Sequence, residues 1–181
     1  MNLLEMILKA QNGDVVREMA NSFQLDEGQA RSAIDALVPA LGRGFSRNAS
    51  RSQGLDDLIG ALQRGDHGRY IEQPSVATQQ VAVEEGNGIL GHIFGSKDVS
   101  RQVASRAAQS SGVDSGVLKK MLPMLASVAM GALAKQGFGD SATNQASGAG
   151  GLGGLLSGFL DADKDGSILD DVMGMAGKFM R

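Results

Sequence analysis

Residues 118–133 read LKKMLPMLASVAMGAL. Leucine, methionine and valine recur there at the three- and four-residue spacing of a helix, so we expect one long helix with Pro123 inside it. Its uncharged run at 121–134 is 14 residues long, which is too short to span a bilayer. The alanine, serine and glycine residues of this run instead predict close contacts with other helices, or self-association.

The composition of the 181-residue chain favours helices packed on one another. Aromatic residues make up 4% of the chain, whereas it holds 9 Met and 26 Gly, so the core must be built from Leu, Met, Val and Ala. Cysteine is absent, which excludes disulfides and thiolate metal ligands. The net charge of −3 argues against nucleic acid as a general partner.

The segment MNLLEMILKAQ at 1–11 carries Glu5 within its apolar run and has no small-residue cleavage site. We therefore expect an amphipathic helix there and not a secretory signal. We expect the protein to be cytoplasmic and to have no transmembrane segment.

Helix signals continue through the first half of the chain. An apolar stripe predicts a helix over 14–23. Asp26 and Gln29 then form a capping-box pattern, in which the aspartate accepts from the backbone and the glutamine reaches back. A long helix should follow, and Pro39 should kink or split it.

The two halves of the chain resemble each other. Residues 71–87 have many small polar residues and no stable period, so they are predicted to link an N-terminal lobe at 1–70 to a C-terminal lobe at 88–181. Three residues recur 84 positions later and the helix start recurs 88 positions later; the pairs are Arg17 and Arg101, Ala20 and Ala104, Pro39 and Pro123, and Asp26 and Asp114. We predict an all-α, multi-helical fold with two similar helical lobes from an internal repeat. Chance alignment of short Ala, Leu and Gly motifs is the alternative.

An EF-hand-like acidic loop precedes the last predicted helix, at 161–171, where the sequence reads DADKDGSILDD. Aspartates at alternate positions followed by glycine match the first half of an EF-hand loop, which binds Ca²⁺ through oxygen ligands. The usual Glu at the twelfth position is Val172 here, so the preceding carboxylates would have to close the shell. At a shift of 98 the first-half positions that match Asp161, Asp163 and Asp165 are Gln63, Gly65 and His67, which carry no carboxylate. We therefore predict one Ca²⁺ site; its ligands are Asp161, Asp163, Asp165, Ser167 through its backbone carbonyl, Asp170 and Asp171.

A plain helix cap is the other interpretation of this loop, with Ser167 and Asp170 as a capping pair. Three clustered carboxylates without a cation would repel one another, and this cost favours Ca²⁺. Mg²⁺ is the poorer fit because it demands stricter octahedral geometry. Whether Asp170 or Asp171 closes the shell, and whether the ion is structural or regulatory, stays open.

Three segments carry a family resemblance: GILGHIFGS at 88–96, LKKMLPMLASVAMGAL at 118–133 and LLSGFLDADKDGSILDDVMG at 155–174. Together they resemble the bacterial family called domain of unknown function 937, which includes YidB-like proteins. The resemblance covers most of the chain and is strongest from residue 86 onward. It implies an all-helical, multi-helix fold and no established activity, and it places the acidic loop of the family on the aspartates named above.

These features favour a non-enzymatic interaction or scaffold protein whose Ca²⁺ loop pins the last helix to its lobe. The chain has only two histidines, His67 and His92, and neither has a visible partner for nucleophilic or acid–base chemistry. The expected partner is another protein or a second copy of the chain.

Two other classes of function are open. Arg43, Arg47 and Arg51 are spaced by four residues and, if helical, would line one face that could contact nucleic acid. The sequence pI of about 5.3 argues against that alternative, and a solvated helix end or loop explains the same arginines. The Gly- and Ala-rich helices could instead associate peripherally with a membrane.

Overall fold

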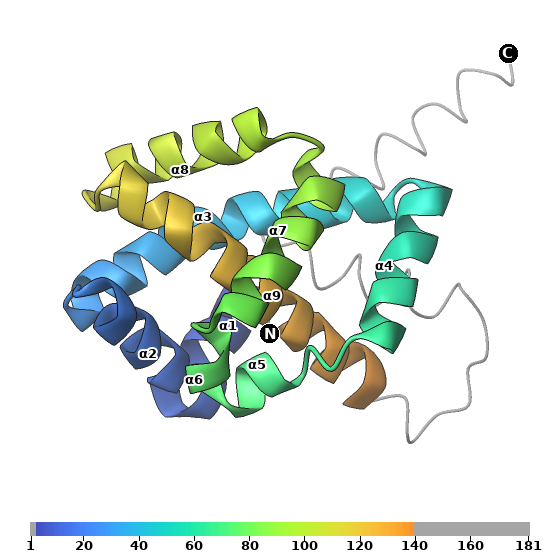
Figure 1. Ribbon diagram of the computed structural model, residues 1–181, viewed down its shortest axis with the longest axis horizontal. Helices are drawn as coiled ribbons and strands as arrows, with labels where there is room; N and C mark the ends of the chain where they lie inside the picture. Colours follow the sequence, from blue (N-terminus) through green and yellow to red (C-terminus); the bar gives the residue numbers. More distant parts are fainter. Residues whose placement is uncertain (1–2, 140–181) are drawn as a thin grey trace, which may run out of the picture.

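The computed structural model describes residues 3–139, which fold into packed helices (Figure 1). In chain order these are α1 (Leu3–Lys9), the 3₁₀ helix η1 (Ala10–Gly13), α2 (Asp14–Phe23), α3 (Glu27–Ala49), α4 (Ser52–Arg64), α5 (Arg69–Glu72), α6 (Pro74–Ala77), α7 (Gln80–Phe94), α8 (Lys97–Ser111) and α9 (Ser115–Gly139). Residues 3–139 contain no strand, and the prediction of an all-α fold is confirmed.

The predicted long helix, α9, runs through the middle of the molecule and contacts α1, α3, α5, α6, α7 and α8 (Figure 1). Its buried side chains include Leu118, Met121, Leu125 and Met130. By length and composition alone, Ser115–Lys135 could cross a membrane, but 78% of that window is buried inside the protein. A helix at the centre of a helical core has the same composition, so this is weak evidence for a membrane span.

Side-chain caps start the two longest helices as the sequence predicts. Asp26 Oδ1 accepts a hydrogen bond from the backbone N–H of Gln29 at 2.7 Å, and Gln29 Oε1 accepts from the N–H of Asp26 at 3.1 Å, which completes the capping box. Asp114 Oδ1 accepts from the N–H of Gly116 at 2.8 Å. Pro39 does not split α3, which continues to Ala49.

The predicted linker at 71–87 is largely helical. It holds the end of α5, all of α6 and the first half of α7. Ala77 and Ala82 are buried in the same hydrophobic core as the long helices, whereas Val81 is 48% exposed. These residues are therefore helical and partly buried, and their role as a linker between two lobes stays a prediction.

One hydrophobic core draws on helices from both ends of the described chain. It includes Ile7 and Met19 from the first two helices and Leu118 from α9. The division into lobes at 1–70 and 88–181, and the internal repeat, stay predictions. The acidic loop at 161–171 and the last predicted helix lie outside the described residues.

Candidate functional site

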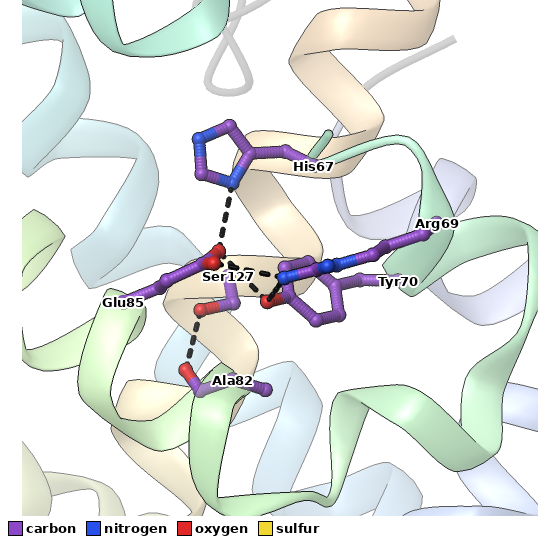
Figure 2. Close-up of polar contacts among 6 residues, drawn as sticks. All are labelled: His67, Arg69, Tyr70, Ala82, Glu85 and Ser127. Atoms are coloured by element: carbon purple, nitrogen blue, oxygen red, sulfur yellow. Dashed lines mark hydrogen bonds and ion pairs between the residues drawn. The ribbon is translucent and has the colours of Figure 1, made fainter. Parts of the chain in front are cut away.

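The crossing of α7 and α9 positions the main buried polar cluster of the described chain. A side chain at Gly86 of α7 would collide with the backbone carbonyl of Pro123 on α9, so the two helices approach each other as closely as their backbones allow. Beside this contact the fully buried Ser127 hydroxyl donates to the backbone carbonyl of Ala82 at 2.7 Å (Figure 2). These two contacts fix the rotation of α7 about its own axis and its position along α9.

Glu85 of α7 sits at the centre of the cluster and faces three side chains from the turn before α5 and from α5 itself (Figure 2). Its Oε1 accepts from Arg69 Nη2 at 2.8 Å, and its Oε2 accepts from the Tyr70 hydroxyl at 2.7 Å. The same Arg69 nitrogen donates to the Tyr70 hydroxyl oxygen at 2.8 Å. His67 Nδ1 lies 3.3 Å from Glu85 Oε2.

Burial in the cluster is uneven. The Tyr70 ring is fully buried and His67 is 7% exposed, whereas the side chains of Glu85 and Arg69 are each 33% exposed. Two glycines make room for His67, because a side chain at Gly65 would meet its ring and one at Gly131 of α9 would meet its backbone carbonyl. The cluster therefore has an apolar inner end at Tyr70 and a solvent-facing outer end at the ion pair.

The electrostatics follow from this geometry. Burial raises the pKa of the Tyr70 hydroxyl, its hydrogen bond to Glu85 raises it further, and the Arg69 guanidinium opposes the shift. The hydrogen bond to Tyr70 raises the pKa of Arg69, against the effect of burial. His67 Nδ1 lies 3.3 Å from Glu85 Oε2 but makes no hydrogen bond with any residue that the structure describes. Arg69 Nε is likewise buried without a hydrogen-bond partner among the described residues.

The contacts of the cluster attach α5 to its neighbouring helices. Both oxygens of Glu85 are engaged by donors, and the Arg69 guanidinium also lies over the Tyr70 ring, 4.9 Å from its centroid. A second ion pair, between Lys135 Nζ of α9 and Glu72 Oε1 of α5 at 3.3 Å, ties the other end of α5 to the core. These contacts hold the short helix α5 between α7 and α9.

The residues predicted to bind Ca²⁺ all lie outside the described range; they are Asp161, Asp163, Asp165, Ser167, Asp170 and Asp171. Within residues 3–139, no group of three or more His, Cys, Asp or Glu side chains is arranged to hold a metal ion. The Ca²⁺ site stays a prediction.

The structure also places the three arginines and the two histidines singled out in the sequence. Arg43 and Arg47 are exposed on α3, but the helix ends at Ala49 and Arg51 follows in extended backbone, so the three arginines do not share one helical face. His67, for which the sequence shows no partner for nucleophilic or acid–base chemistry, lies beside Glu85. His92 is exposed at the end of α7, where its backbone carbonyl accepts from Asn48 Nδ2 at 2.8 Å.

Sequence reasoning missed Glu85 and Tyr70 as parts of a site. The usable signal was the spacing of Ala82, Gly86, Ile89 and Ile93, which is helical and places Glu85 beside the buried stripe.

Comparison with known families then shows which family the chain belongs to. The model of a family described as "Bacterial protein of unknown function (DUF937)" matches residues 5–136.

The chain belongs to the DUF937 family. The DUF937 match spans the described helices from α1 almost to the end of α9 and stops before the acidic loop at 161–171. The matched region thus contains the α7–α9 crossing and the Glu85 cluster. No curated protein and no solved structure matches this chain.

Proposed function

We propose that this DUF937 protein is a non-enzymatic interaction or scaffold module, in which a rigid helical body carries a C-terminal segment that binds one Ca²⁺ ion. The observation that carries the proposal is the pattern DADKDGSILDD at 161–171, whose alternating aspartates supply hard oxygens at EF-hand spacing. The ligands are those predicted from the sequence, and bound Ca²⁺ holds the last predicted helix against the body.

The polar groups of the body support a structural role. Glu85, the best placed carboxylate for acid–base chemistry beside His67, has both oxygens engaged by Arg69 and Tyr70. The Ser127 hydroxyl is fully buried and donates to Ala82, so it is not available as a nucleophile. These contacts favour rigidity over a poised acid, base or nucleophile.

We also propose the internal repeat as the origin of the body. In its support, α2 and α8 each begin with an aspartate–arginine ion pair three residues apart, Asp14 with Arg17 and Asp98 with Arg101. Each helix ends in a left-handed residue, Gln24 or Gly112, and the next helix is capped by an aspartate two residues later. The four-residue difference between the copies is about one helical turn.

Calorimetric titration of the full chain with CaCl₂ tests the Ca²⁺ site. We expect one ion per chain in the wild type and loss of binding in the double variant Asp163→Ala/Asp165→Ala. The matched control is Asp56→Ala/Asp57→Ala, which removes the same charge from α4 and should bind as the wild type does. A wild-type chain that takes up no Ca²⁺ rejects the site.

A further inference from the structure

A cavity of about 430 Å³ lies where the C-terminal end of α7, the N-terminal end of α8 and α9 meet. Its volume falls within the range of small-molecule sites. We propose that this cavity binds an organic phosphate, with the phosphate group on a cationic rim formed by Lys97, Arg101 and Lys119 and the apolar body of the ligand on a floor formed by Leu90, Leu122 and Pro123. The proposal does not depend on the Ca²⁺ segment.

The charge of the rim is opposite to that of the whole chain. The chain has a net charge of −3, yet the cavity is lined by three cations and by no carboxylate. Neither Lys97 nor Lys119 makes an ion pair with any described residue, and Arg101 is paired only with the exposed Asp98, 2.9 Å away. Exposed pairs of this kind contribute little, so Arg101 can turn to a stronger anion.

The backbone adds to the attraction for an anion. α8 is 15 residues long and its N-terminal end lines the cavity from Ser96 to Lys97, so its dipole adds positive potential there, although the Val99 N–H already donates to Ser96 Oγ at 3.3 Å. Gly91 and Gly95 have open space where a side chain would lie, which leaves the backbone accessible. Such a site suits a phosphate, with a charge of about −1.5 to −2 at neutral pH, better than a single carboxylate.

The floor explains why the ligand should carry more than phosphate. Leu90 of α7 and Leu122 and Pro123 of α9 line the inner wall of the cavity beside the rim; Leu90 and Leu122 are only 5% and 1% exposed, so the apolar body of a ligand would gain van der Waals contact with them more than it would cover exposed area. A soluble phosphate monoester and the head group of an anionic phospholipid share this chemistry. They differ in whether the ligand is free or held in a bilayer.

The test uses the full chain and three probes: inorganic phosphate, phenyl phosphate, and phosphatidylcholine vesicles containing phosphatidylglycerol. Binding of the soluble probes is followed by calorimetry and by the amide NMR signals of Gly91 and Gly95, and vesicle binding by flotation. The test variant is Arg101→Ala/Lys119→Ala. The control, Arg106→Ala/Lys120→Ala, removes the same charges from exposed positions on the same helices that do not line the cavity.

We expect phenyl phosphate to bind more tightly than inorganic phosphate, to shift both glycine signals, and to lose about tenfold or more in affinity in the test variant only. Vesicle binding with the same dependence on the two variants, and no binding of phenyl phosphate, assigns the site to a lipid head group. Equal affinities for the two soluble phosphates overturn the role of the floor. No binding of any probe, or equal losses in the two variants, overturns the proposal.

Discussion

Gly86 of α7 lies against the backbone carbonyl of Pro123 in α9, with no room for a side chain between them. This contact joins the two helices that share the most extensive interface of the described chain, and it sets the position of Glu85 one residue earlier. Small residues permit it, because the approach is made by backbone and not by interlocking side chains.

Substituting Gly86 by alanine should therefore separate the helices. We expect Gly86→Ala to lower the free energy of unfolding by about 1–3 kcal/mol, the usual cost of overpacking. Gly88→Ala on the same helix is the control, since nothing lies within 4 Å of its added methyl group and alanine is the better helix former by about 1 kcal/mol. Urea denaturation measures both, and equal stabilities of the two variants would contradict the close contact.

Removing the central carboxylate should cost stability through the groups that it leaves behind. Glu85→Ala strips the buried Tyr70 hydroxyl of its acceptor and Arg69 of its partner, so we expect a loss of about 1–3 kcal/mol in the free energy of unfolding. Glu84→Ala is the control because Glu84 is exposed and accepts a hydrogen bond from Gln80 on the surface, so its effect should stay within about 0.5 kcal/mol. A Glu85 variant as stable as the Glu84 variant would refute the anchoring role.

Tyr70 offers a direct measure of the cluster, because it is the only tyrosine of a chain that has no tryptophan. The phenolate absorbance should titrate above the ordinary pKa of about 10 while the helices remain folded, owing first to burial and then to Glu85. Glu85→Gln should lower the midpoint by removing the negative charge and the carboxylate acceptor. A wild-type midpoint at or below that of free tyrosine is incompatible with the structure.

The same shift makes stability depend on pH. A raised pKa means that the folded state holds its proton more tightly than the unfolded state. The contribution of Tyr70 is therefore fully present below about pH 10 and is lost as the pH rises from there through the folded pKa. Urea midpoints on either side of pH 10 should fall with rising pH in the wild type and fall less in Tyr70→Phe.

The two aspartate caps should contribute similarly to the free energy of unfolding. We expect Asp26→Ala and Asp114→Ala each to lower the free energy of unfolding by about 1 kcal/mol, because each leaves backbone N–H groups of a long helix without their acceptor. Asp35→Ala, at an exposed position inside α3, is the control and should be close to neutral. Thermal unfolding followed by circular dichroism compares the three, and a cap variant as stable as the control would contradict the assignment.

The sequence predicted the structure correctly where a single local pattern, such as a helix cap or one apolar stripe, is enough to identify a helix. The Asp26–Gln29 capping box, the α2 helix and the long apolar helix α9 are all present in the structure. The helices within 71–87 were not predicted, because the buried face of α7 begins with Ala82 and Gly86. Small residues are what close packing on α9 requires, but they give almost no hydrophobic signal.

The polar cluster lay beyond the reach of sequence patterns for a related reason. His67 and Glu85 are 18 residues apart, on either side of α5 and α6, and they meet only because α9 holds both segments. Arg51 shows the opposite error. Its four-residue spacing from Arg47 suggests a shared helix face, but α3 ends between the two residues. A spacing rule holds only as far as the helix that it assumes.

The central claim is that Ca²⁺ bound at the acidic segment holds the last predicted helix against the helical body. Thermal unfolding of the full chain in chelator and in millimolar CaCl₂ tests it most directly, since a ligand that binds only the folded state stabilises it by an amount that grows with its concentration. We predict a higher melting temperature in Ca²⁺ for the wild type and none of this gain for Asp163→Ala/Asp165→Ala. Superimposed wild-type curves in the two conditions would contradict the account.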